Sequence, residues 1–402
     1  MRVLIADKLA PWVTDRLEAA GCAVTTMPGI KDAALTEALA TINPAALVVR
    51  STKVGKAQLE AAKDLSLIVR AGAGVNTIDV ATASARGVYI SNCPGKNAIA
   101  VAELTIGHLV NLDRRIADNV ASLRAGAWAK GEYSKADGLA GKSMAVLGVG
   151  DIGREVIKRA QAFGISVRAW SRSLSPEAAA QLGVRHCASP LEACRGADIL
   201  SVHLALAPET RGMVGRELLE ALSRGAYVIN TSRGEVLDEA ALLEAIETRG
   251  LRAGLDVFEG EPAGNDGELR SPISAHPRVY GTHHIGASTN QASDAVGLEV
   301  VRIVSTYLQE GTVPNCVNLE TRSPATHVLV VRHADQVGVL AGILHHLREA
   351  HVNVQEMENI IFRGAAAACA RIQVDRAPDA QTIARINESE AIFATSVVAL
   401  SR

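Results

Sequence analysis

Short apolar runs alternate with helical patterns through the first ninety residues of the chain. Four runs have the length and the aliphatic content of β-strands: RVLIA (2–6), AALVVR (45–50), LSLIVRAG (65–72) and GVYISN (87–92). The segments between them read as helices. Strands that alternate with helices in this way form a parallel sheet with helices packed on it.

A second series of the same kind follows a long helix that starts near Asn97 and a loop rich in Lys, Gly and Ser at 125–142. The run SMAVLGVGDIG (143–153) opens this series, and a final helix is expected at about 289–310. Later strands are predicted at 166–171, 197–204, 226–232 and 251–258. The fold class is therefore α/β, with two Rossmann-like, doubly wound parallel sheets.

A third unit of about eighty residues follows a linker at 312–324. It contains a strand at 327–333, an amphipathic helix at 338–350, two paired strands (VNVQEMENIIF and AAACARIQVD), a helix (AQTIARINES) and a last strand (IFATSVVAL). The order is βαββαβ, which predicts a small ferredoxin-like domain.

Length and composition fit this picture. The 402 residues suffice for two or three domains, and aromatic residues make up only 3%, so aliphatic side chains fill the interior. The net charge is −2 with both signs interspersed, which disfavours nucleic acid or a membrane surface as a partner. The most apolar run (98–112) contains Glu103 and His108, so it reads as a buried helix and not as a membrane span.

The six cysteines form no CxxC pair and no spacing typical of a metal site. We therefore expect no metal and a reducing compartment. The first residues, MRVLIADKLAP, lack the apolar core of a signal peptide, so a cytoplasmic protein is expected.

The segment LGVGDIG has the G-x-G-x-x-G spacing between a predicted strand and a predicted helix. Its glycines are Gly148, Gly150 and Gly153. In this context the pattern predicts a dinucleotide whose phosphates face the helix amides of Asp151 and Ile152. The alternative is a glycine turn that binds no ligand.

The next strand ends at Ser171, and no acidic residue stands there to hold ribose hydroxyls. Arg172 follows directly. A small neutral residue followed by arginine suits the 2′-phosphate of NADP(H). The alternative is that Arg172 only stacks on the adenine of NAD, so the sequence leaves NAD or NADP open.

Polar residues follow three successive strands of the second sheet. Arg233 comes after one strand in INTSRGEVLDEAAL, Glu261 after the next in LDVFEGEP, and the pair His283 and His284 stands in THHIGAS. Ligands of α/β sheets bind at the carboxyl ends of strands. A hydride transfer needs a proton acceptor and a cation for the substrate carboxylate, and these residues supply both. Each also has a non-catalytic interpretation: Arg233 as a surface arginine, Glu261 as a charge in a loop, and His284 as a histidine of the core.

Together with the glycine loop, the segments INTSRG, LDVFEGEP and HIGAST resemble the D-isomer-specific 2-hydroxyacid dehydrogenase family, over nearly all of residues 1–320. The resemblance implies that His284 is the catalytic acid/base and that Glu261 bonds to it and raises its pKa. It implies that Arg233 binds the substrate's carboxylate and carbonyl.

The same resemblance implies further cofactor contacts and a domain plan. Asp256 matches the residue that holds the nicotinamide amide, and the cofactor-binding residues Thr231, Ser232 and Gly286 lie in the same segments. The implied domains are a discontinuous substrate-binding domain (1–94 and 287–324), an NAD(P)-binding Rossmann domain (95–286) and a C-terminal domain (325–402).

Two arginines end strands of the first sheet, Arg50 in VVRSTKV and Arg70 in IVRAGAG. Two such cations suit a second anionic group on the substrate, because guanidinium binds phosphate in a bidentate manner. Here the chain resembles the 3-phosphoglycerate dehydrogenases, and Ser51 and Asn97 match other substrate-side positions. The alternative is that both arginines are charges on the rim of the cleft.

The C-terminal unit resembles an ACT domain, a module that senses amino acids and in some relatives binds serine. His333 and Asn353 match residues of that site, whereas Asp335 replaces an asparagine. We therefore predict an effector site at His333, Asp335 and Asn353, and the alternative is that the unit only assembles subunits.

The sequence thus predicts an NAD(P)-dependent oxidoreductase acting on a small phosphorylated hydroxyacid, 3-phosphoglycerate. The alternatives are a hydroxypyruvate or glyoxylate reductase, and a nucleotide-sensing binding protein similar to the C-terminal-binding corepressors. By resemblance, we expect a homodimer or a homotetramer.

Overall fold

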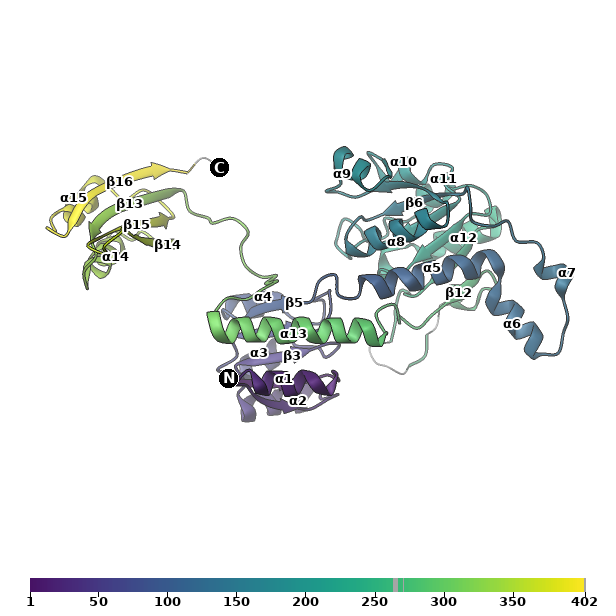
Figure 1. Ribbon diagram of the computed structural model, residues 1–402, viewed down its shortest axis with the longest axis horizontal. Helices are drawn as coiled ribbons and strands as arrows, with labels where there is room; N and C mark the ends of the chain where they lie inside the picture. Colours follow the sequence, from purple (N-terminus) through teal and green to yellow (C-terminus); the bar gives the residue numbers. More distant parts are fainter. Residues whose placement is uncertain (263–266, 270, 401–402) are drawn as a thin grey trace. The chain divides into compact units, whose positions relative to one another are not determined.

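The computed structural model describes residues 1–262, 267–269 and 271–400. The chain divides into two compact units, residues 1–318 and residues 319–402. The first unit contains two separate parallel sheets, and the second contains one antiparallel sheet (Figure 1). The predicted α/β class with a small C-terminal domain is confirmed. The predicted split of residues 1–324 into two domains stays a prediction, since the first unit is undivided.

The first sheet is parallel and has five strands in the order β2-β1-β3-β4-β5. The strands are β1 (Arg2–Ile5), β2 (Ala23–Thr26), β3 (Ala46–Val49), β4 (Leu67–Arg70) and β5 (Tyr89–Asn92). The helices that cover it are α1 (Pro11–Ala19), α2 (Asp32–Ile42), α3 (Lys56–Ala61), α4 (Val80–Ala85) and α13 (Asn290–Glu310).

Both faces of the first sheet are buried under helices. Successive side chains of a strand point to opposite faces and so enter different cores. Leu4 packs into the core under α2, α3 and α4, whereas Val3 and Ile5 pack into the core under α1 and α13. Helix α13 thus returns to the first sheet almost two hundred residues after β5, and it lies beside α1 (Figure 1). The indole of Trp12 donates a hydrogen bond of 3.2 Å to Asp294 across this helix pair.

The second sheet has seven parallel strands in the order β12-β11-β10-β9-β6-β7-β8. They are β6 (Ser143–Leu147), β7 (Ser166–Trp170), β8 (Arg185–His186), β9 (Ile199–Val202), β10 (Tyr227–Asn230), β11 (Arg252–Leu255) and β12 (Val279–Gly281). One face packs on α5 (Ala98–Arg114), α8 (Asp151–Ala162) and α9 (Pro176–Gln181). The other packs on α10 (Pro190–Cys194), α11 (Arg216–Ala221) and α12 (Glu239–Arg249).

Helix α6 (Ile116–Arg124) ends just before the segment 125–142 expected to be a loop, and it has no buried residue. The short helix α7 (Lys130–Tyr133) lies within that segment. A left-handed Arg115 at φ 50° ends α5 and starts α6. The 3-10 turns η1 (Gly234–Val236) and η2 (Pro272–Ala275) complete the unit.

The second unit has the predicted βαββαβ order. It consists of β13 (His327–Ala334), α14 (Val339–Glu349), β14 (Val354–Ile361), β15 (Ala367–Val374), α15 (Ala380–Asn387) and β16 (Ile392–Ala399). The antiparallel sheet has the order β14-β15-β13-β16, and alternate residues of β13 and β15 share one core with both helices.

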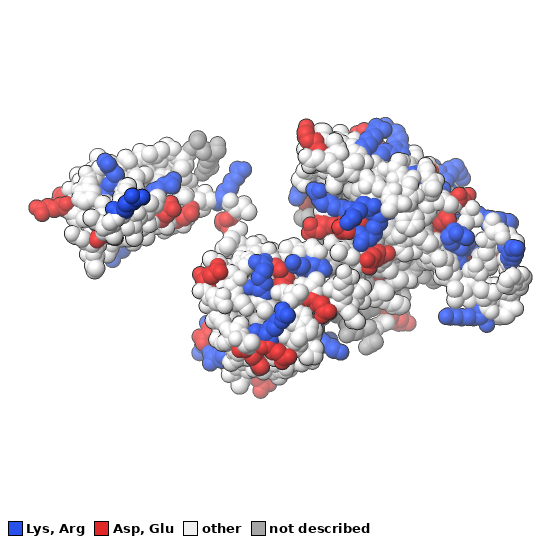
Figure 2. All heavy atoms as spheres, viewed as in Figure 1, with Lys and Arg blue, Asp and Glu red and all other residues white. Residues whose placement is uncertain are grey.

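Acidic and basic side chains are interspersed on the face drawn in Figure 2. No helix among the described residues combines the length and the apolar content needed to cross a membrane. The same residues contain no group of three or more His, Cys, Asp or Glu that could hold a metal ion.

Candidate active site

The glycine loop joins β6 to α8, and two of its glycines are required by close backbone contacts. A Cβ added at Gly148, whose φ is +96°, would lie 2.3 Å from the carbonyl oxygen of His203, and one at Gly153 would lie 2.1 Å from that of Gly148. A Cβ at Gly150 would meet open space. Gly150 is also the N-cap residue of α8, and no side chain caps the first amides of that helix. The amides of the first turn, including Asp151 and Ile152, therefore remain for an anion, which fits the pyrophosphate of a dinucleotide.

The end of β7 carries Ser171, which is half-buried, and Arg172, which is exposed. Because β7 is the neighbour of β6 in the sheet, both residues lie beside the glycine loop at the carboxyl edge. This is the position at which an adenosine ribose is bound in such folds.

The turn after β10 presents Arg233 from a rigid backbone. Asn230 accepts hydrogen bonds from the amide of Ser232 at 3.0 Å and from its hydroxyl at 2.7 Å, and it donates to the carbonyl of Arg233 at 2.9 Å. The hydroxyl of Thr231 lies 2.9 Å from that of Thr105 on α5. Thr231 and Ser232 are buried and Arg233 is half-buried, and Nη1 of Arg233 donates a hydrogen bond to the carbonyl of Ser232 at 2.6 Å.

Asp256 follows β11, is only 1% exposed, and holds the loop that contains His284. Its Oδ1 accepts from the hydroxyl of Thr282 at 2.6 Å and from the amide of Ile285 at 2.8 Å, and its Oδ2 accepts from the amide of Gly286 at 2.8 Å. Its backbone carbonyl accepts from the amide of His284 at 2.8 Å. These four bonds hold His284 at φ 51°, a conformation that is uncommon for a residue with a Cβ.

Few acceptor positions of Asp256 remain for the nicotinamide contact that the family resemblance implies. A carboxylate offers about four lone-pair positions, and the loop occupies three of those of Asp256. One acceptor position on Oδ2 remains for a nicotinamide amide.

Glu261 and His284 form a hydrogen-bonded pair. The Nδ1 of His284 lies 2.7 Å from the Oε2 of Glu261, whose Oε1 accepts from the amide of Phe258 at 2.9 Å. The bond to Glu261 raises the pKa of His284 against the opposing effects of burial and of Arg233. Burial raises the pKa of Glu261, but the hydrogen bonds from His284 and Phe258 outweigh it and the net pKa is lowered. No described residue bonds to Nε2 of His284, so this atom is available to a substrate hydroxyl.

His283 is exposed, as His284 is, but it has no hydrogen bond within the described part of the chain. The structure therefore brings only one of the two adjacent histidines to the carboxylate.

Three arginines from different strands come together without a carboxylate partner among the described residues. Burial lowers the pKa of the Arg70 guanidinium, and the positive charges of Arg233 and Arg50 lower it further. The Nε of Arg70 is buried and has no hydrogen-bond partner. A Cβ at Gly72 would lie 1.6 Å from Nη1 of Arg70, and one at Gly74 would lie 3.0 Å from Nη2 of Arg233. Three clustered positive charges, together with a buried N–H that has no partner, favour the binding of an anionic ligand at this place.

The loop that carries Arg50 is held by Asp7, a residue that the sequence did not single out. Its Oδ2 accepts from the amides of Arg50, Ser51 and Thr52 at 2.6, 3.1 and 3.0 Å, and its Oδ1 accepts from the hydroxyl of Ser51 at 2.9 Å. Burial opposes ionisation of Asp7, but these bonds hold its pKa below the ordinary value of 3.8. The Ser51 hydroxyl is thus committed to Asp7, whereas Asn97 starts α5 and makes no capping bond.

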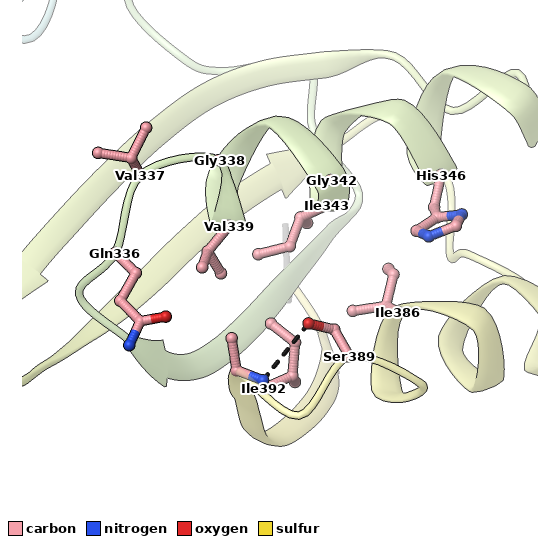
Figure 3. Close-up of a pocket in the computed structure, with 11 residues that line it drawn as sticks. Gln336, Val337, Gly338, Val339, Gly342, Ile343, His346, Ile386, Ser389 and Ile392 are labelled. Atoms are coloured by element: carbon pink, nitrogen blue, oxygen red, sulfur yellow. Dashed lines mark hydrogen bonds between the residues drawn. The ribbon is translucent and has the colours of Figure 1, made fainter.

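The three predicted effector residues lie apart from the cavity of the second unit. This cavity of about 300 Å³ lies between the 336–338 loop, α14, the end of α15 and the start of β16 (Figure 3). His333 is buried, with its ring nitrogens 2.8 Å from the carbonyl of Ala334 and 3.1 Å from Oδ1 of Asn359. Asp335 and Asn353 are exposed and do not line the cavity.

Comparisons with known proteins agree with this geometry. The family model described as D-isomer specific 2-hydroxyacid dehydrogenase, NAD binding domain, matches residues 106–286. A hydroxypyruvate reductase of Thermotoga maritima is 40% identical over 258 residues, which are 63% of this chain and 82% of that protein. The chain belongs to the D-isomer specific 2-hydroxyacid dehydrogenase family.

Other members of the 2-hydroxyacid dehydrogenase family match more of the chain. A D-3-phosphoglycerate dehydrogenase of Methanocaldococcus jannaschii is 36% identical over 321 residues, 79% of this chain and 60% of that relative. The chain therefore spans about three fifths of the relative's length. Among solved structures, the TT0316 protein of Thermus thermophilus has a TM-score of 0.70 at 31% identity, over 79% of this chain and all of that one.

Membership of the 2-hydroxyacid dehydrogenase family confirms the resemblance inferred from the sequence, whereas the roles of individual residues stay predictions. Sequence reasoning missed Asp7, Asn230 and Thr282. Each ends or follows a strand and sits within or next to a motif already noted. A search for every polar residue at the carboxyl end of a predicted strand would have found them.

Proposed function

We propose that this chain is a D-3-phosphoglycerate dehydrogenase. The observation that carries the proposal is the group of Arg50, Arg70 and Arg233 beside the His284–Glu261 pair. A single carboxylate on the substrate accounts for one of these cations, Arg233. The remaining two, one with an orphaned buried Nε, fit a phosphate, which has three strong acceptor oxygens.

In the oxidation direction, the C2 hydroxyl of the substrate gives its proton to Nε2 of His284. The electron pair of the broken O–H bond forms the C2 carbonyl, and C2 loses a hydride. A bound nicotinamide supplies the acceptor for that hydride. His284 then carries the proton to solvent, and every step reverses when the ketoacid is reduced.

The residues around His284 have distinct tasks in this reaction. Glu261 fixes the ring with Nε2 toward the substrate and stabilises the imidazolium that forms. Arg233 binds the carboxylate and polarises the forming carbonyl, since a cation stabilises the charge that develops on oxygen. Arg50 and Arg70 bind the phosphate, with Ser51 and Asn97 at the edge of the site.

Initial rates with 3-phosphohydroxypyruvate and with hydroxypyruvate, followed at the nicotinamide absorbance, test the proposal. We expect fast turnover of the phosphorylated ketoacid and slow turnover of the other.

The second candidate function is reduction of hydroxypyruvate itself. It is favoured by the Thermotoga maritima hydroxypyruvate reductase, of which this chain covers 82%. Equal or faster turnover of hydroxypyruvate would establish this alternative, and Arg50 and Arg70 would then be rim charges.

We propose further that the cofactor is NADP(H), bound through Gly148–Gly153, Thr231, Ser232, Asp256 and Gly286, with its 2′-phosphate at Ser171 and Arg172. Two features support this. Arg172 is exposed and can reach a phosphate, and the residue before it is Ser171 and not a carboxylate that would repel the phosphate. Rates with NADPH and NADH side by side decide the matter, and a preference for NADH would assign Arg172 to the adenine face.

For the domains, we propose that residues 1–94 and 287–324 bind the substrate, residues 95–286 the cofactor, and residues 325–402 a regulator. The packing of α13 on the first sheet supports the discontinuous domain.

An amino-acid effector at the second unit is supported by its cavity of about 300 Å³, and calorimetric titration with a panel of amino acids tests it.

All six cysteines are free thiols, which supports a reducing compartment, the cytoplasm.

We also propose that the chain forms a homodimer, or a homotetramer, through α6 and the segment after it. Ile116, Val120 and Leu123 lie on one face of α6 at helical spacing and are 46%, 38% and 51% exposed, and Trp128 is 82% exposed. Light scattering of the wild type and of Leu123→Asp tests this, and a monomeric wild type would refute it.

A further inference from the structure

His108 lies in the middle of α5, in contact with the strand that leads to Asp256. The residue is 4% exposed. A Cβ added at Gly254 of β11 would lie 2.8 Å from Cβ of His108 and 3.1 Å from its Nδ1. The glycine in β11 therefore makes room for this histidine, two residues before Asp256.

The hydrogen bonds around His108 have one possible direction. The hydroxyl of Thr282 has a single proton, and it donates that proton to the carboxylate of Asp256 at 2.6 Å. The contact of 3.1 Å between Thr282 Oγ1 and Nε2 of His108 must then have the histidine as its donor. This places a proton on Nε2 of His108. Burial lowers the pKa of His108 despite the nearby charge of Asp256, which favours the neutral ring.

This chain of bonds reaches the acid/base through Asp256. His108 orients Thr282, Thr282 occupies one lone pair of Asp256 Oδ1, and two further lone pairs of Asp256 receive the amides of Ile285 and Gly286. Those amides flank the backbone that holds His284 in its left-handed conformation. We propose that His108 is a positioning residue that fixes the loop of His284 through Thr282 and Asp256.

A purely structural role does not account for the choice of histidine. Leu109 and Leu112 of the same helix are fully buried aliphatic residues, and a leucine at 108 would fill the site without the cost of burying an imidazole. The imidazole N–H instead satisfies the Thr282 oxygen, and burying a carboxylate such as Asp256 is costly unless its neighbours are held in place to bond to it.

The inference rests on the proposed dehydrogenase activity and is tested by two substitutions at His108 in the full-length chain. His108→Leu removes the donor at similar volume, and His108→Gln places an amide N–H where Nε2 stands. The matched control is His276→Leu, since His276 also bonds through Nε2, to Glu247 at 2.9 Å, but lies outside the site.

We expect His108→Leu to lower kcat roughly tenfold, the equivalent of one lost hydrogen bond of about 1.4 kcal/mol in the transition state. KM for the ketoacid and for the nicotinamide cofactor should change less than about twofold, because the substrate-binding arginines and the glycine loop are untouched. His108→Gln should recover most of kcat, and His276→Leu should behave as the wild type.

A wild-type kcat in His108→Leu, or a His108→Gln variant as slow as His108→Leu, would overturn the inference. So would a loss confined to KM. Should His108→Leu fail to fold, His108→Met removes the same donor with a more adaptable side chain. A readout independent of turnover is the pKa of His284 by NMR, which we expect to fall in His108→Leu as the bond to Glu261 loosens. A wild type without turnover would refute the proposed function alone, and an unchanged His284 pKa would refute the inference alone.

Discussion

Nδ1 of His284 lies 2.7 Å from the Oε2 of Glu261, and this bond raises the pKa of the histidine that we propose as the acid/base. The pKa of His284 is raised above its ordinary value of 6.5, and that of Glu261 is lowered below its ordinary value of 4.5. Reduction of a ketoacid needs His284 protonated. The rate of reduction should therefore persist above pH 6.5 and fall as the pH rises through the raised pKa.

Glu261→Gln should move this falling limb to lower pH. The substitution removes the negative charge that favours the imidazolium and leaves at most a neutral acceptor oxygen, so His284 loses its proton at lower pH. The measurement is the pH profile of kcat/KM for reduction, with wild type and variant in the same buffers. A limb that stays in place, or moves upward, would contradict the role of Glu261.

The same pair makes a prediction for stability. A histidine whose folded pKa is raised contributes stability that is fully present below its unfolded pKa and is lost as pH rises through the folded pKa. A glutamate whose folded pKa is lowered contributes above its unfolded pKa. Glu261→Gln should therefore lower Tm more at about pH 6 than at about pH 9, measured by thermal unfolding at constant ionic strength.

His284→Asn should abolish turnover while the chain still binds the nicotinamide cofactor. Loss of a general acid/base costs about 100-fold to 10,000-fold in rate, whereas the glycine loop that faces the cofactor's phosphates is unchanged. His283→Asn, next to it and exposed, is the matched control and should be active. If wild type and His284→Asn both bind the cofactor and neither turns over any ketoacid, the chain is a nucleotide-sensing protein and not an enzyme.

Asp7→Ala should raise KM for the phosphorylated ketoacid about tenfold with little change in kcat, because the loop of Arg50 and Ser51 loses its anchor. Asp64→Ala is the control, since Asp64 is an exposed aspartate of the same sheet region whose carboxylate pairs with Arg2. A fall in kcat at unchanged KM would assign Asp7 to the chemistry instead.

The sequence predicted most strands and helices because their apolar runs are long and buried on both faces. It did not name β2, whose four residues are mostly exposed at the edge of the first sheet, and it did not name the short strands β8 and β12, which have two and three residues. None of these elements has enough buried apolar residues to stand out from a loop.

The candidate catalytic motifs were visible because each follows a strand, and parallel strands bring their carboxyl ends to one edge. The supporting contacts were not visible. The bonds of His108 to Thr282 and of Asp7 to Ser51 join residues 174 and 44 positions apart, and only the packing of α5 and the register of β1 on β3 bring them together. The motif likewise gave no sign that Asp256 uses most of its acceptor positions on its own loop.

The central claim is that Arg50 and Arg70 select a phosphorylated substrate, and Arg70→Ala tests it most directly. The quantity to measure is the ratio of kcat/KM for 3-phosphohydroxypyruvate to that for hydroxypyruvate, in wild type and in the variant. Arg86→Ala, an exposed arginine of the same region, is the control. We predict that Arg70→Ala lowers this ratio about tenfold to a hundredfold, the loss of one charged hydrogen bond. If both substrates lose activity equally, Arg70 does not bind the phosphate and the account is wrong.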